Sequence, residues 1–250
     1  MSMATETLER KNFSVSDQLT HLLLWLAMVD LTVESDAWAL TQAQNHFDTS
    51  NHRAILSAAP HTGHTDGLFI RRAVYELFPS QLAHLLFLSA KDTWSSPVKR
   101  ALAELIIGEF YPYDRNATMS VAKAQLKELD QKITGTSEKP GQTVAVFPQG
   151  TRTPGAPLHH LPVMLAEKAK VPVLLFSIHG AENVFPKVAE HEGKRQMVDT
   201  LLRRVSHGKK HHTPVTIKLE EFIPAHTPRK KAEARFFEVH EKTMTTEPFE

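Results

Sequence analysis

Short, largely apolar runs recur along this chain and limit what it can fold into. Five of them are "AILSAA" (54–59), "AHLLFLSA" (83–90), "TVAVF" (143–147), "VPVLLFSIHG" (171–180) and "VTIKLEEFI" (215–223). Apolar runs of this length are typical of strands, and the near absence of charge in the first four is typical of strands buried on both faces. Helical patterns separate them. We therefore expect an α/β fold, with a largely parallel mixed sheet flanked by helices.

The segments between these runs have helical periodicity. They are "GLFIRRAVYELF" (67–78), which Pro79 ends, "PVKRALAELII" (97–107), "MSVAKAQLKELDQKI" (119–133) and "LPVMLAEKAK" (161–170). The chain also has a helical pattern from its start to about Ala43, followed by a polar linker, "QNHFDTSNHR" (44–53). No repeat or domain linker is evident, so we predict a single domain over 1–250, with an N-terminal helical cap at 1–50.

The overall composition excludes several classes of protein. With 41% hydrophobic and 23% charged residues, the chain has the composition of a globular protein. The 29 Lys and Arg nearly balance the 28 Asp and Glu, so no strong positive field points to nucleic acid as a partner. There is no cysteine, which excludes a disulfide framework, a thiolate nucleophile and a thiolate metal site.

The first residues are polar and lack the apolar core of a signal peptide, which predicts a cytoplasmic location. The longest uncharged apolar run near the start, "LLLWLAMV" (22–29), is far too short to span a bilayer. A helix over 20–33 would carry Leu and Trp side chains either into the core or into a lipid surface. The pattern of this segment leaves both interpretations open.

A polar motif, "APHTGHTDG" (59–67), directly follows the first predicted strand. It has three interpretations, of which the simplest is a helix cap, with Thr65 or Asp66 at the N-terminus of the next helix. A metal site formed by His61, His64 and Asp66 is the second, but the spacing matches no common metal motif. That site would need distant ligands, for which the candidates are His159, His160, His211 and His212.

The third interpretation is an acid-base pair. His61 would accept a proton from an attacking hydroxyl, while Asp66 would orient the imidazole and stabilise the imidazolium. The chain has no cysteine and no G-x-S-x-G elbow, so the attacking hydroxyl would belong to a substrate. From this stretch alone the helix cap is favoured over both other interpretations.

Two further polar loops follow predicted strands, and their position bears on these interpretations. In a parallel sheet the carboxyl ends of the strands meet at one edge, where ligands bind. The loop "PQGTR" (148–152) follows the third run and "HGAENVFPK" (179–187) follows the fourth. Both should therefore lie near His61.

The order of these motifs resembles the glycerolipid acyltransferase superfamily, which contains the glycerol-3-phosphate and 1-acylglycerol-3-phosphate (lysophosphatidate) acyltransferases. The four blocks are H-x4-D (61–66), "YPYDR" (111–115), "FPQGTR" (147–152), and "VPVLLFSIHG" followed by "VFPK". The segment "LSAKDTWSSPVKRAL" (88–102), with Lys91, is similar to the family segment between the first two blocks. The resemblance covers 54–187, over half of the chain.

The resemblance implies transfer of a fatty acyl group from acyl-CoA or acyl carrier protein to a hydroxyl of a lipid acceptor such as lysophosphatidate. It implies neither a cofactor nor a metal nor an acyl-enzyme, with His61 as general base and Asp66 as its orienting partner. It associates Arg115 and Arg152 with the acceptor phosphate, and guanidinium groups do form bidentate bonds to phosphate. The other residues that it implies at the substrate are Lys91, Phe147, Gln149, Gly150 and Thr151.

The chain departs from the family pattern at Gln149, where the family usually has Glu. An amide keeps one acceptor but loses the charge. A second hypothesis is therefore transfer to a hydroxyl or amine of an acceptor without phosphate. From another class, a metal-dependent hydrolase would use His61, His64 and Asp66.

Amphiphilic substrates imply that the protein meets a membrane surface. We expect peripheral association, with the helix at 20–33 as the docking element. The basic run "RRVSHGKKHH" (203–212) would assist at anionic headgroups.

Overall fold

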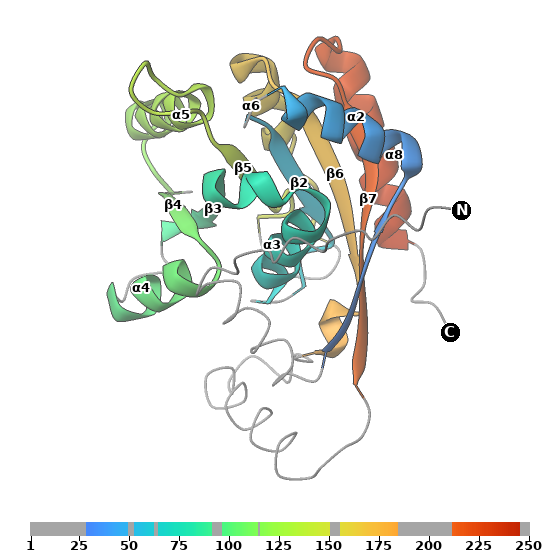
Figure 1. Ribbon diagram of the computed structural model, residues 1–250. Helices are drawn as coiled ribbons and strands as arrows, with labels where there is room; N and C mark the ends of the chain where they lie inside the picture. Colours follow the sequence, from blue (N-terminus) through green and yellow to red (C-terminus); the bar gives the residue numbers. More distant parts are fainter. Residues whose placement is uncertain are drawn as a thin grey trace, which may run out of the picture.

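The computed structural model describes residues 29–49, 53–62, 65–91, 97–114, 116–150, 156–184 and 212–245 (Figure 1). In these residues seven strands form one sheet, in the order β1-β7-β6-β2-β5-β3-β4. The strands are β1 (Val29–Ser35), β2 (Ile55–Ala59), β3 (Leu85–Ala90), β4 (Glu109–Tyr113), β5 (Thr143–Val146), β6 (Val173–His179) and β7 (Thr213–Ile223). The helices are α2 (Ala37–Asp48), α3 (Asp66–Leu77), α4 (Pro97–Ile106), α5 (Met119–Thr134), α6 (Leu161–Ala169) and α8 (Arg229–Thr245), with 3-10 turns η1 (Pro79–His84) and η3 (Ala181–Asn183).

The sheet is largely parallel. Strands β6, β2, β5, β3 and β4 run in one direction, whereas β7 is antiparallel to β6 and pairs in parallel with β1. Every residue of β2 and of β5 is buried, as expected for central strands covered on both faces. The predicted α/β class, with a mixed sheet flanked by helices, is confirmed.

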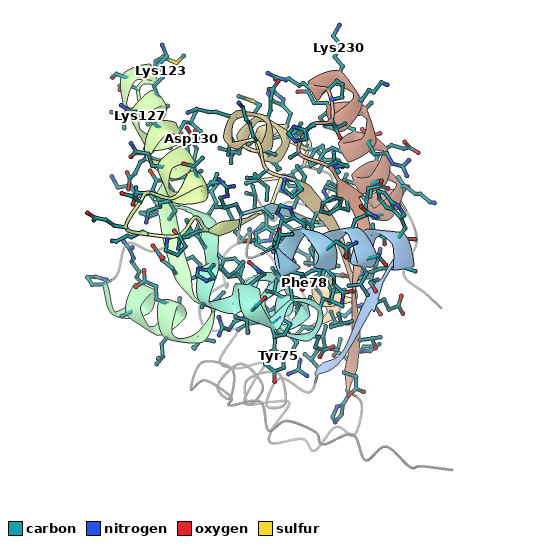
Figure 2. The ribbon with its side chains drawn as sticks, turned by 45° about the horizontal axis from the view of Figure 1, so that its top comes forward. Tyr75, Phe78, Lys123, Lys127, Asp130 and Lys230 are labelled. Carbon is teal, nitrogen blue, oxygen red and sulfur yellow. The ribbon has the colours of Figure 1, made fainter. Side chains whose placement is uncertain are left out.

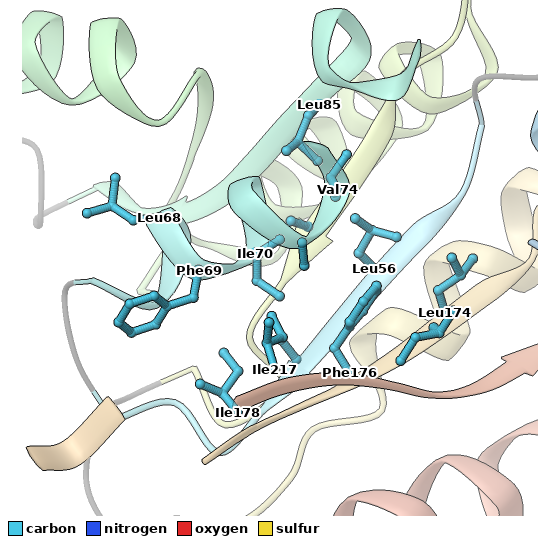
Figure 3. Close-up of a cluster of buried hydrophobic side chains, with 14 of the residues drawn as sticks. Leu56, Leu68, Phe69, Ile70, Val74, Leu85, Leu174, Phe176, Ile178 and Ile217 are labelled. Atoms are coloured by element: carbon cyan, nitrogen blue, oxygen red, sulfur yellow. The ribbon is translucent and has the colours of Figure 1, made fainter. Parts of the chain in front are cut away.

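Two apolar cores lie on the two faces of the sheet, because alternate strand residues point to opposite faces. On one face, Leu56 of β2 and Phe176 of β6 pack against α3, as Figure 3 shows, and α2 and α4 cover the same face. On the other face, Ile55 and Leu175 pack against α5, α6 and α8. Figure 1 shows α2 and α8 on opposite sides of the β6–β7 region.

Lysine side chains lie on the outer faces of α5 and α8. Lys123 and Lys127 of α5 and Lys230 of α8 point away from the sheet (Figure 2). Because helices cover both faces of the sheet, the sheet is the middle of three layers.

The connections after β2 and β5 leave toward opposite faces of the sheet. Strand β2 leads into α3 in the first core, while the neighbouring β5 leads into α6 in the second. Adjacent parallel strands whose connections diverge in this way leave a crevice at their carboxyl ends, where α/β proteins bind ligands. A ligand site is therefore expected at the loops after β2 and β5.

The turn after β6 depends on Gly180. Its φ is +84°, and a Cβ at this position would collide with the backbone oxygen of Pro214. Gly180→Ala is therefore expected to lower the free energy of unfolding by at least about 2 kcal/mol, measured by urea denaturation. Lys170 is the matched control, because it ends α6 at φ 55° with a side chain in place. Lys170→Gly should leave the free energy of unfolding unchanged or raise it. An unchanged free energy of unfolding in Gly180→Ala would show that this turn does not require glycine.

The structure corrects the expectation of a helix up to about Ala43. Residues 29–35 form β1, in which Leu31 and Val33 face the core while Thr32 and Glu34 alternate with them on the other face. This period of two is the strand pattern. Asp36 then caps α2 by accepting a hydrogen bond from the Ala39 N–H at 2.9 Å. Helix α2 continues through the first part of the predicted linker.

The remaining predicted helices and all five predicted strands are present, with ends shifted by a few residues. Strand β4 and helix α8 were not predicted. Most of the predicted docking helix (20–28) and of the basic run (203–211) lies outside the described residues. Among the helices that the structure does describe, none combines the length and apolar character needed to cross a bilayer.

Candidate active site

His61 and Asp66 lie on either side of the turn between β2 and α3. The Nδ1 atom of His61 lies 2.7 Å from Oδ2 of Asp66. The Asp66 side chain is fully buried, whereas the imidazole is 19% exposed. The same Oδ2 accepts a hydrogen bond from the backbone N–H of Thr62 at 2.8 Å. The five-residue spacing therefore folds the loop back on itself, as the sequence predicts for an acid-base pair.

This contact sets the tautomer of the imidazole. An ionised carboxylate only accepts hydrogen bonds, so Nδ1 of His61 is the donor to Asp66. The neutral ring then has its lone pair on Nε2, which makes Nε2 the atom that can take up a proton. Asp66 also lies in the first turn of α3, where a negative charge is favourable.

Phe147 holds the face of the imidazole. The two rings stack with 4.2 Å between their centroids and 15° between their planes. Phe147 follows the last residue of β5, and β5 pairs directly with β2. The imidazole is therefore held at one edge by Asp66 and on one face by Phe147.

Gln149 contacts the backbone of His61. Its Oε1 accepts a hydrogen bond from the His61 N–H at 2.5 Å, and its Nε2 donates a long one to the Ala156 carbonyl at 3.5 Å. The residue is only 3% exposed. The next residue, Gly150, has φ +61° and its N–H donates to the Phe147 carbonyl at 3.0 Å, which closes a tight turn.

The other predicted substrate residues divide into two groups. Lys91 is exposed just after β3, whose neighbour is β5, and Gly150 is exposed in its turn. Arg115, Thr151 and Arg152 lie outside the described residues, and the third predicted loop is described only as far as Val184. Contact of these residues with a substrate therefore stays a prediction.

The helix-cap interpretation of the motif accounts for less than the acid-base pair. Thr65 occupies the capping position of α3 but makes no side-chain cap hydrogen bond. The Asp66 carboxylate bonds instead to His61 and Thr62, which precede the helix.

The metal interpretation gains no support from the described side chains. Within the ranges that the structure describes, no group of three or more His, Asp and Glu side chains is placed to hold a metal. His159 and His160 are exposed, and Nδ1 of His212 lies 2.8 Å from Asp30 on β1. His64 and His211 lie outside these ranges.

A buried polar pair between β2 and α8 was not predicted. The hydroxyl of Ser57 on β2 lies 2.9 Å from Nε2 of His240 on α8, and both residues are fully buried. Burial lowers the pKa of His240 to about 3, so the imidazole is neutral at pH 7. The two residues are 183 positions apart in sequence, and no local pattern relates them.

Comparison with known proteins does not assign a family. No family model matches the chain, and no curated protein matches its sequence. We therefore infer the function from the geometry of the site and from the resemblance of the motifs.

Proposed function

We propose that the protein is an acyltransferase, which moves a fatty acyl group from an acyl-CoA or acyl carrier protein thioester to a hydroxyl of a glycerolipid acceptor such as lysophosphatidate. The observation that carries this proposal is the bond between His61 Nδ1 and Asp66 Oδ2. This bond leaves Nε2 of His61, at the carboxyl edge of the sheet, as the atom that would take up the proton of a substrate hydroxyl.

The reaction proceeds by direct attack. Nε2 of His61 removes the proton of the acceptor hydroxyl as its oxygen attacks the thioester carbonyl. The new ester C–O bond forms, the C–S bond breaks, and the imidazolium returns the proton to the leaving sulfur. The buried carboxylate of Asp66 stabilises the imidazolium between these two transfers.

The protein need not supply a nucleophile for this reaction. The chain has no cysteine, and the hydroxyl of Ser57 is buried against His240. In this proposal the acceptor hydroxyl attacks the thioester itself, without an acyl-enzyme.

In this proposal Arg115 and Arg152 bind the phosphate of the acceptor, and Lys91 and Thr151 contact the same substrate. Guanidinium groups suit that role because their planar fork matches phosphate oxygens. The protein would meet its acceptor at a membrane surface, and binding to anionic liposomes tests that part separately.

Acceptors without phosphate were the second hypothesis, motivated by Gln149. In the structure this amide is buried and hydrogen-bonded to His61 and Ala156. That arrangement gives no reason to prefer an uncharged acceptor.

Thiol release tests the reaction. With acyl-CoA or acyl carrier protein as donor, free thiol should appear only when an acceptor is added, and faster with lysophosphatidate than with an uncharged lysolipid. A chelator should leave the rate unchanged. Release at the same rate without any acceptor would indicate a thioesterase, and inhibition by the chelator would favour the metal-dependent hydrolase.

A further inference from the structure

We propose that Gln149 is a positioning residue for the catalytic base, which holds the backbone of His61, and not a contact for the acceptor. This inference rests on the proposed function, because it concerns how the same base is aligned. The Gln149 amide then affects kcat and has no effect on the affinity for the substrate.

The burial and hydrogen bonds of Gln149 support a positioning role. Both ends of the amide are engaged within the protein, Oε1 by the His61 N–H and Nε2 by the Ala156 carbonyl. At 3% exposure the side chain offers almost no surface to a ligand. An acceptor would have to displace the bond to His61 in order to reach Oε1.

The turn after β5 contacts His61 in two ways. Phe147 stacks on the imidazole and Gln149 accepts from the backbone N–H of the same residue. Because the Gly150 N–H closes this turn onto the Phe147 carbonyl, the two contacts belong to one rigid unit. Asp66, from the other side, holds the Nδ1 edge of the ring and accepts from the backbone N–H of Thr62.

Loss of the Gln149 contact therefore removes the hydrogen bond that holds the backbone of His61. A displacement of about 1 Å at a reacting group can lower a rate by roughly 10²-fold. The His61 N–H would also lose its acceptor in a buried setting, which is unfavourable. Holding the His61 N–H requires an oxygen acceptor at this point, which Glu supplies and Met does not. Glu gives up only the long 3.5 Å bond from Nε2 to the Ala156 carbonyl.

Two variants separate the role in alignment from a role in binding. Gln149→Met is expected to lower kcat by roughly 10- to 100-fold with little change in the KM for lysophosphatidate. Gln149→Glu is expected to retain kcat within a few-fold, because its carboxylate keeps the bond to His61. Gln131→Met, the same substitution on the exposed face of α5, is the matched control and should change neither constant.

The His61 amide provides a readout that does not depend on activity. In ¹⁵N-labelled protein its proton should resonate downfield and exchange slowly in the wild type and in Gln149→Glu. In Gln149→Met it should move upfield and exchange faster. A raised KM with an unchanged kcat, or an unchanged His61 amide in Gln149→Met, would overturn the inference.

Failure of the proposed function would look different. If the wild type transfers no acyl group to any acceptor, the acyltransferase proposal is wrong and the kinetic comparison is not applicable. The His61 amide signals in the same proteins then still decide whether Gln149 holds this backbone.

Discussion

His61→Ala is expected to lower the kcat for acyl transfer by about 10²- to 10⁴-fold, because a positioned base contributes that much to proton removal in the transition state. The fold should persist, since His61 lies in a loop and its side chain is not part of either apolar core. The measurement is thiol release at saturating donor and acceptor, with circular dichroism to check folding.

Two further variants sharpen this test. Asp66→Asn keeps the size of the side chain but removes the charge and presents a donor or an acceptor to Nδ1, so it should also lower kcat strongly. His159→Ala removes an exposed histidine close to the same loops and should leave turnover unchanged. Normal turnover in His61→Ala would show that another group is the base.

Acidification is expected to destabilise the protein through His240. In the folded state burial lowers the pKa of this imidazole to about 3, whereas its ordinary value in an unfolded chain is 6.5. The unfolded state therefore takes up the proton first as pH falls through 6.5, and stability decreases until the folded state is protonated near pH 3. For one group the full loss is on the order of 4–5 kcal/mol.

Urea denaturation between pH 7 and pH 4 measures this effect. His240→Gln removes the titrating ring but keeps a polar partner for Ser57, so its stability should change less with pH than that of the wild type. Both proteins share every other titrating group. Equal pH dependence in the two proteins would assign the loss of stability to other residues.

The predictable part of the fold is its centre. Strands β2 and β5 are buried along their whole length, so their sequences are continuously apolar and stand out from the helices. Edge strands have no such signature. Pro112 within β4 argues against a strand in sequence, but an edge strand tolerates proline because one side of it forms no ladder. In β1 the alternating pattern adjoins an apolar run, which led to the helix prediction.

The site was predictable where its contacts are local. His61 and Asp66 are five residues apart across a strand–turn–helix junction, and a motif can encode that distance. The contacts of His61 with Phe147 and Gln149 require β2 and β5 to be neighbours, although β3 and β4 come between them in sequence. The partnership of Ser57 and His240 depends in the same way on how α8 packs.

The pairing of β2 with β5 has a consequence for how activity is acquired during folding. The motif 61–66 and the turn at 147–150 come together only when these two strands are adjacent. During refolding, much of the helical structure could form before His61 makes its contacts with Phe147 and Gln149. If the proposed acyl transfer is measured during refolding, its rate should return with the central strand pairs and later than helical content.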